Sequence, residues 1–159
     1  MKTLSVYVDT SVFGGCGDEE FKTVSTRFFD EVRAGRFLVI ISDLVSAELA
    51  QAPEGVQLVL ASLHESCVSM VKFDEHCLRL RDTYVTEGIV GPSSRNDAGH
   101  VATATVHRAD AIVSWNFKHI VHLEKIRLYN AVNLREGYGT IEVRSPQEVV
   151  HEDEDLRLR

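Results

Sequence analysis

Short hydrophobic runs and longer stretches with helical spacing alternate along the chain. The short runs are rich in β-branched residues and end at turn residues, which is typical of buried strands. They predict strands at residues 4–8, 37–41, 67–71 and 111–115, and a more exposed last strand at residues 140–145. Between consecutive strands, apolar residues recur every three or four positions, which is the spacing of an amphipathic helix.

The intervening stretches therefore predict helices. In residues 19–35, Phe21, Val24, Phe28 and Val32 share one face, and Gly35 ends the pattern. The other predicted helices cover residues 42–51, 54–65, 74–88, 93–109 and 120–137. Strands that alternate with helices form a parallel sheet covered on both faces, with right-handed crossovers. We therefore expect an α/β fold.

Polar residues directly follow two of the predicted strands. Asp9 ends the first strand, and after it come the hydroxyl residues Thr10 and Ser11 and then a glycine pair that predicts a turn. Asn116 follows the strand at residues 111–115. Ligands of open α/β sheets bind beyond the carboxyl ends of the strands. Asp9 and Asn116 are thus expected in one crevice if their strands are neighbours.

Two further acids stand at unusual positions on predicted helices. Glu48 comes four residues after Leu44 and three after Val45, which puts its carboxylate beside the apolar face of a short helix. A carboxylate there is costly unless it is paired or binds a cation. Asp97 opens an alanine-rich helix, and its spacing from Ser94 predicts a capping box.

Composition narrows the class of protein. The 159 residues carry a net charge of −7, which argues against binding of nucleic acid by a basic surface. It does not argue against an enzyme that binds phosphate through a metal ion. The N-terminus lacks the pattern of a signal peptide and no apolar run reaches membrane-spanning length, so we expect a cytoplasmic protein. We expect one domain over residues 1–150 and a charged tail over residues 151–159. Three cysteines are interpreted as reduced thiols: Cys16, Cys67 and Cys77.

Four stretches together resemble the PIN-domain family, and within it the VapC-like toxins of bacterial toxin–antitoxin systems. They are VYVDTSVFGG, SDLVSAELAQAP, SRNDAGHVATATVHRADAIVSWNFKHI and IEVRSPQEV, and they extend from Val6 to Val149. Each motif is short, but their order and spacing make the resemblance specific. It implies a PIN-like three-layer α/β/α sandwich with a central, mainly parallel sheet.

The resemblance also implies a function and a set of site residues. Proteins of this kind are Mg²⁺- or Mn²⁺-dependent ribonucleases, often homodimeric, that an antitoxin protein restrains. By position, the metal-binding acids fall on Asp9, Glu48 and Asp97. The fourth catalytic position, commonly Asp, is Asn116 here, and asparagine supplies an oxygen without a charge. This departure leaves open whether one metal ion or two would bind.

Further side chains in these motifs are candidates for contact with an RNA substrate. They are Thr10, Ser11, His100, Ser114, Lys118 and His119. The hydroxyl residues Thr10, Ser11 and Ser114 are alternatively expected to hold the two strand-end loops. Trp115 is expected to pack at the sheet edge rather than to stack on a base.

Each candidate also has an ordinary structural interpretation. Asp9 and Asn116 are common turn residues, Glu48 is able to pair with a surface cation, and the histidines are expected at the surface. A PIN-like binding module without catalysis is therefore the rival function. A phosphotransfer domain is disfavoured because Ser11 stands where an Asp-x-Asp motif needs its second aspartate. A dinucleotide enzyme is disfavoured because no G-x-G-x-x-G motif follows a strand.

Overall fold

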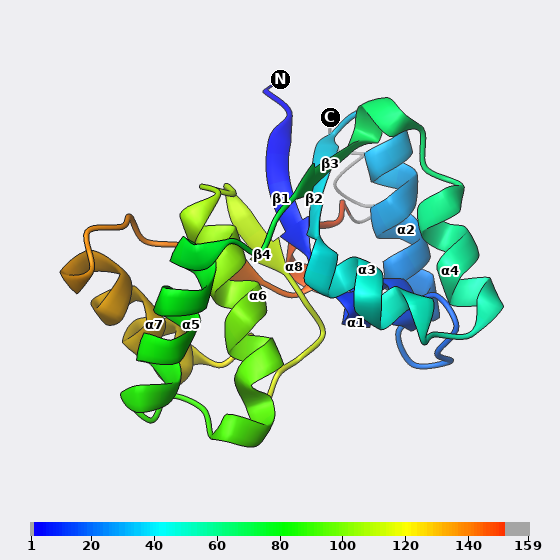
Figure 1. The fold of residues 1–159 in the computed structure, drawn as a ribbon. Helices are drawn as coiled ribbons and strands as arrows, with labels where there is room; N and C mark the ends of the chain where they lie inside the picture. Colours follow the sequence, from blue (N-terminus) through cyan, green and yellow to red (C-terminus); the bar gives the residue numbers. More distant parts are fainter. Residues whose placement is uncertain (1, 152–159) are drawn as a thin grey trace.

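Five strands form one parallel sheet in the computed structural model, which describes residues 2–151 (Figure 1). The strands are β1 (Leu4–Val8), β2 (Phe37–Ser42), β3 (Val68–Val71), β4 (Ala111–Val113) and β5 (Glu142–Arg144). Their order is β3-β2-β1-β4-β5, and every neighbouring pair is parallel. The predicted parallel sheet is thus confirmed, whereas residues 152–159 of the predicted tail lie outside the described residues.

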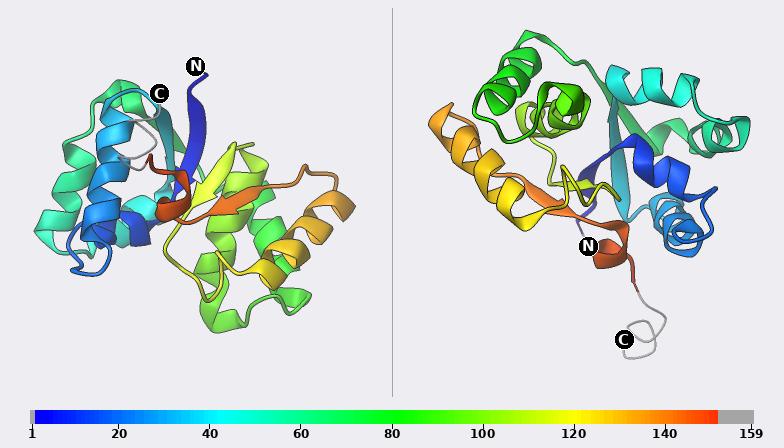
Figure 2. Two further views of the ribbon diagram at one scale, coloured as in Figure 1. Left: turned by 180° about the vertical axis from the view of Figure 1, so that it is seen from behind. Right: turned by 90° about the horizontal axis from the view of Figure 1, so that it is seen from below.

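Helices cover both faces of this sheet and complete a three-layer α/β/α sandwich (Figure 1). One side carries α1 (Thr10–Gly15), α2 (Lys22–Arg33), α3 (Asp43–Ala50) and α4 (Glu54–Ala61). The other side carries α5 (Glu75–Thr86), α6 (Arg95–Val106) and α7 (Leu123–Arg135). The view from behind shows the short α8 (Pro146–Val149) beside α2 (Figure 2). Two 3-10 turns, η1 (Glu65–Cys67) and η2 (Pro92–Ser94), precede β3 and α6.

The core forms where the central strands meet helices on both faces. The residues Val6, Tyr7 and Val8 of β1 are all buried, as expected for a strand covered on both sides. The edge strand β3 is less covered, and Met70 is exposed. Within residues 2–151, no helix combines the length and the apolar character needed to span a bilayer.

Two local predictions were wrong. The glycine pair expected to form a turn lies inside α1, because Val12 and Phe13 bury that helix in the core. The capping box predicted at the start of α6 does not form, because the Ser94 side chain makes no hydrogen bond to the helix backbone. The side chain of Asp97 is therefore not explained by capping.

The strand order places a topological switch point between β1 and β4. The chain leaves β1 for β2 on one side, whereas β4 pairs with β1 on the other. Val8 is in register with Val113, so Asp9 and Ser114 follow side by side at the carboxyl ends of their strands. Crevices at such switch points are the usual ligand sites of open α/β sheets.

Candidate active site

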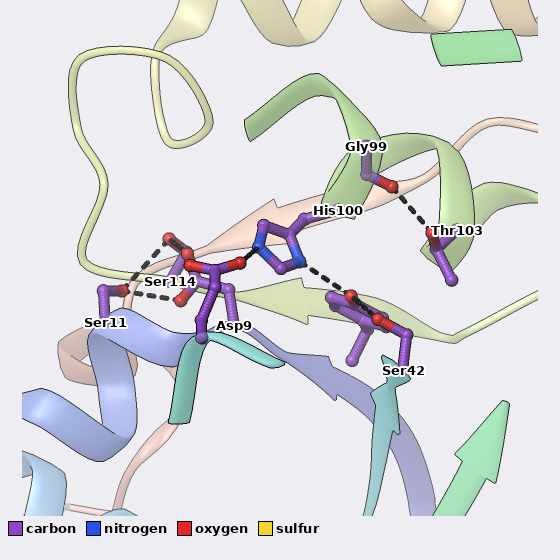
Figure 3. A network of polar contacts seen from close by, with 9 residues as sticks. Asp9, Ser11, Ser42, Gly99, His100, Thr103 and Ser114 are labelled. Carbon is purple, nitrogen blue, oxygen red and sulfur yellow. Dashed lines mark hydrogen bonds and ion pairs between the residues drawn. The ribbon is translucent and has the colours of Figure 1, made fainter. Parts of the chain in front are cut away.

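Asp9 lies at this switch point and is hydrogen-bonded to the loop that follows β4. Its Oδ1 accepts a hydrogen bond from Ser11 Oγ at 2.6 Å, and its Oδ2 accepts one from Ser114 Oγ at 2.8 Å (Figure 3). The two hydroxyls in turn accept hydrogen bonds from the backbone N–H groups of Trp115 and Asn116, at 2.8 and 2.9 Å. Ser11 and Ser114 therefore hold the two loops together, which was the alternative to contact with the substrate.

Asp9 is 5% exposed, and this burial is the main influence on the pKa of its carboxyl group. Burial raises the pKa of Asp9, and the nearby Glu48 carboxylate raises it further. The imidazole of His100 and the two serine hydroxyls oppose this rise. A buried carboxylate that repels a neighbouring carboxylate favours a cation between them.

Glu48 is held by a histidine rather than by a surface cation. His100 Nε2 lies 2.5 Å from Glu48 Oε1, and His100 Nδ1 lies 2.7 Å from the Tyr7 hydroxyl. The Tyr7 hydroxyl also contacts Ser42 Oγ at 2.7 Å, which completes a polar chain through the core (Figure 3). Because a carboxylate only accepts, Nε2 carries the proton and donates to Glu48.

This chain makes His100 a support for Glu48. Its side chain is 3% exposed and both ring nitrogens are engaged, so it has no free atom for a substrate. The prediction of a substrate contact and the alternative of a surface histidine are both replaced by a buried partner of Glu48. Burial opposes ionisation of Glu48, but the hydrogen bond and charge of His100 outweigh it and lower the pKa of Glu48. Glu48 is therefore an ionised carboxylate with its side chain 38% exposed.

Asp97 stands in the first turn of α6, three residues before His100. Its carboxylate makes no hydrogen bond and no ion pair with the rest of residues 2–151. It is half-buried, and its charge helps to raise the pKa of His100, against the effect of burial. An unpartnered carboxylate in the first turn is stabilised by the helix dipole and remains free to bind a cation.

Thr10 contributes a further unsatisfied oxygen. Its hydroxyl lies near Glu48 and helps to lower the pKa of that carboxylate. Nevertheless, Oγ1 is the one buried side-chain polar atom of residues 2–151 outside hydrogen-bonding geometry with any described group. Buried polar atoms normally have a partner, so an unsatisfied one beside carboxylates indicates a place for water or a bound ion.

The loop after β4 carries Asn116 and His119, and through His119 it contacts η2 and α7. Asn116 Oδ1 accepts a hydrogen bond from the backbone N–H of His119 at 2.9 Å, which is a turn-forming contact. His119 Nε2 lies 3.2 Å from Ser94 Oγ, and its Nδ1 lies 3.1 Å from Lys125 Nζ. Lys118 is exposed. The Ser94 hydroxyl that was expected to cap α6 therefore contacts this loop instead.

A second group of metal-ligand residues lies away from the switch point. Among residues 2–151, Asp74, Cys77 and His107 are the one set of three whose donor atoms all lie within 4.8 Å of one another. Asp74 caps the N-terminus of α5, while the Cys77 thiol and His107 Nε2 both contact the carbonyl of Lys72. All three groups already have backbone hydrogen-bond partners, so we assign no metal here. Asp9, Glu48 and Asp97 are more widely spaced than this, which suits coordination partly through water.

Several residues of this site were missed by the sequence interpretation. Tyr7 was interpreted only as a strand residue, Ser42 only as the start of a helix, and Lys125 only as part of a helix. A tyrosine in a fully buried strand and a histidine on an alanine-rich helix did offer a signal, because buried polar groups need partners.

Comparisons with known proteins agree with this fold. No family model and no curated protein matches the sequence. Among solved structures, the chain is similar to VapBC2 from Rickettsia felis bound to a DNA fragment from their promoter, with 14% identity, a TM-score of 0.56, and coverage of 89% of this chain and 98% of that one. It is similar to FitAcB from Neisseria gonorrhoeae with 14% identity, a TM-score of 0.57, and coverage of 91% and 99%.

A third similar structure is FitAB bound to an IR36 DNA fragment, with 15% identity, a TM-score of 0.56, and coverage of 92% and 99%. These matches extend over almost the whole of each solved chain, so the similarity concerns the complete fold. At this level of identity it establishes the arrangement of the elements and not the chemistry. The protein therefore has a PIN-like α/β/α fold shared with these structures, as its sequence motifs predicted.

Proposed function

We propose that this protein is a metal-dependent endoribonuclease and the toxin of a toxin–antitoxin pair. The main observation behind the proposal is that the Asp97 carboxylate has no hydrogen-bond partner within residues 2–151. Asp97 lies on α6, the helix whose His100 binds the Glu48 carboxylate. The sequence also offered structural explanations for these acids, namely a capping box for Asp97 and a surface ion pair for Glu48. The described part of the structure contains neither of these contacts. The remaining explanation is a site for a hard cation at the switch point.

The residues present fit Mg²⁺ or Mn²⁺. All the donors are oxygens, Glu48 is ionised, and Thr10 Oγ1 is unsatisfied beside it. Asp9, Glu48 and Asp97 would hold the ion directly or through water, because Mg²⁺ keeps several of its waters. When bound, such an ion lowers the pKa of a water and polarises a phosphoryl oxygen.

The chain's own residues orient that chemistry. His100 fixes one oxygen of Glu48 and leaves the other free, while Ser11 and Ser114 fix the carboxylate plane of Asp9. The Asn116 amide oxygen is taken by the backbone of His119, so its NH₂ group is the part that would donate to a phosphate oxygen of RNA. These residues would position the phosphate of the RNA and help to stabilise the negative charge that develops on it during cleavage.

The fold supports the partners that we propose. The similar structures are named VapBC2 and FitAB. We infer that an antitoxin chain binds this protein and inhibits its activity. We extend this to an RNA substrate, to a homodimer and to a cytoplasmic location as parts of the same proposal.

The test is cleavage of RNA with Mg²⁺, with Mn²⁺ and with EDTA. We expect cleavage only with a metal ion, and loss of about three orders of magnitude in rate in Asp9→Asn and Asp97→Asn. Asp30→Asn, on the exposed surface of α2, is the matched control and should cleave as wild type does. Wild-type rates in Asp9→Asn or Asp97→Asn would refute the assignment.

A PIN-like binding module is the second candidate, and one observation favours it. Asn116 stands at the position that is commonly an acid, and its amide oxygen serves the backbone rather than a ligand. Calorimetric binding of Mg²⁺ without cleavage of total RNA would support the module over the nuclease.

A further inference from the structure

The loop after β4 exposes an aromatic ring next to the candidate site. Phe117 is 49% exposed and directly follows Asn116. Its backbone N–H donates to the carbonyl of Trp115 at 3.0 Å, which makes a tight turn and directs the chain outward. The Phe117 ring is therefore accessible to a ligand at the position next to Asn116.

Phe117 ends a row of aromatic rings. Phe21 stacks on Trp115 with ring centroids 4.2 Å apart, and Trp115 lies 6.1 Å from Phe117. Trp115 is locked by its Nε1–H, which donates to Ser25 Oγ on α2 at 2.8 Å. The row is therefore rigid on its inner side, and a planar base is able to extend it from the outer side.

His119 fixes the other end of the same loop. Its backbone N–H donates to Asn116, its carbonyl accepts from the Tyr129 hydroxyl at 2.8 Å, and its two ring nitrogens contact Ser94 and Lys125. Burial and the Lys125 ammonium lower the pKa of His119. A neutral ring accepts from Lys125 at Nδ1 and donates to Ser94 at Nε2. His119 thus positions the Lys125 ammonium beside the loop.

The ammonium groups here lack acidic partners. Neither Lys118 nor Lys125 forms an ion pair with a carboxylate in the part of the chain that the structure describes. This is notable in a protein with a net charge of −7. Uncompensated cations beside an exposed aromatic ring match the requirements of single-stranded nucleic acid, which presents phosphates and unstacked bases.

We propose that Phe117 stacks on an unpaired base of the RNA and that Lys125, positioned by His119, binds an adjacent phosphate. The inference rests on the proposed function, because it deepens the same site by naming the side chains that would contact the RNA. Phe117 directly follows Asn116, and His119 contacts both Asn116 and Lys125, so the two proposed contacts belong to one connected loop and one short stretch of RNA would reach both. A duplex buries its base faces and is excluded from the Phe117 contact.

Binding without metal separates this inference from cleavage. The probes are a fluorescein-labelled uridine 20-mer and the same strand paired with an adenosine 20-mer, titrated with the full-length protein in EDTA and followed by anisotropy. Repulsion from the bare carboxylates acts equally on wild type and variants. We expect the single strand to bind more tightly than the duplex.

The variants give a specific pattern. Phe117→Ala should weaken binding of the single strand by about 5- to 150-fold, the range for loss of one stacked base, and leave duplex binding unchanged. Phe117→Tyr should restore it. Lys125→Gln should reduce the slope of log Kobs against log salt by about 0.7, as expected for one lost phosphate contact. Leu134→Ala, which removes an apolar side chain that is 61% exposed near the C-terminus of α7, should bind as wild type does.

The outcomes distinguish the two proposals. Single-strand binding that depends on Phe117 without any metal-dependent cleavage keeps this inference and refutes the nuclease. Cleavage that is unaffected by Phe117→Ala, with unchanged binding, refutes this inference and keeps the nuclease. A change of sedimentation coefficient in Phe117→Ala at unchanged RNA affinity would assign Phe117 to a protein interface and also overturns the inference.

Discussion

His100 illustrates how a single buried residue links the core to the candidate site. Its ring joins the Tyr7 hydroxyl inside the sheet to the Glu48 carboxylate at the crevice. Both partners lose a hydrogen bond if the ring is removed, and a buried polar group without a partner costs about 1–3 kcal/mol. The residue is therefore important for stability and for the orientation of Glu48 together.

Comparison of His100→Ala with Tyr7→Phe separates these two effects. We expect both variants to lower the free energy of unfolding in urea, by about 3 kcal/mol for His100→Ala and about 1 kcal/mol for Tyr7→Phe. Only His100→Ala should weaken Mg²⁺ binding in calorimetry, because only it releases Glu48. Wild-type Mg²⁺ affinity in a folded His100→Ala protein would show that Glu48 needs no support.

Asn116 offers a second test at the residue scale. An aspartate at this position still accepts the backbone N–H of His119, so the loop keeps its shape, and it adds one negative charge to the loop that Ser114 joins to Asp9. One added charge in a partly solvated site is worth about 1–2 kcal/mol toward a divalent cation. Asn116→Asp should therefore strengthen Mg²⁺ binding about tenfold in calorimetry. An unchanged affinity would remove Asn116 from the metal site.

The sequence predicted which acids to consider, but it did not predict their surroundings. Asp9 stood out because ligands bind beyond the carboxyl ends of strands, and Glu48 because an apolar helix face is a costly place for a carboxylate. The status of Asp97 depended on Ser94, whose hydroxyl contacts His119, 25 residues further along the chain. Local spacing cannot reveal a competitor so distant in sequence, and the capping box was predicted for that reason.

Among the elements, α1 shows how tertiary contacts override a local turn signal. It contains Gly14 and Gly15, which predict a turn, yet it forms a helix because Val12 and Phe13 are buried. Gly15 has a packing role, because a Cβ atom there would lie 2.3 Å from Ser25 Oγ and 2.9 Å from Trp115 Nε1. The close approach of α1, α2 and the loop after β4 thus requires glycine at position 15.

Two adjacent glycine variants test this close approach. Gly15→Ala should destabilise the protein by about 2 kcal/mol, because it forces apart the hydrogen bond between Ser25 and Trp115. Gly14→Ala is the control, since a Cβ there meets nothing within 4 Å, and it should be neutral or stabilising by up to about 1 kcal/mol. Urea unfolding followed by the fluorescence of the single tryptophan measures both. Equal stabilities of the two variants would contradict the packing role.

The strands were predictable because their signal is local. The runs at residues 4–8 and 37–41 are short, β-branched and bounded by turns, and they correspond to β1 and β2. The predicted strand at residues 111–115 extends too far, since β4 ends at Val113. There Ser114 turns its hydroxyl to Asp9 across 105 residues of chain, a contact that hydrophobic spacing does not encode.

At the scale of the whole molecule, the strand order brings Asp9 and the loop after β4 to one edge of the sheet. Asp9, Glu48 and Asp97 come from β1's end, α3 and α6, and none of these segments is adjacent to another in sequence. The motif order predicts that these acids meet, and the change in winding direction between β1 and β4 is the feature of the fold that provides a crevice for them. The fold therefore holds like charges in proximity, as the raised pKa of Asp9, due to burial and to Glu48, indicates.

A divalent cation should consequently stabilise the whole fold. An ion that binds the native site and not the unfolded chain adds about 1.4 kcal/mol at roughly ten times its Kd, which for a domain of this size raises Tm by about 4 °C. We expect this shift in thermal unfolding with MgCl₂, and none with NaCl at the same ionic strength. Asp97→Asn should reduce the shift, whereas Asp30→Asn on the exposed face of α2 should keep it. The same shift in NaCl, or in Asp97→Asn at saturating Mg²⁺, would mean that the ion screens surface charge rather than joins Asp9, Glu48 and Asp97 at the switch point.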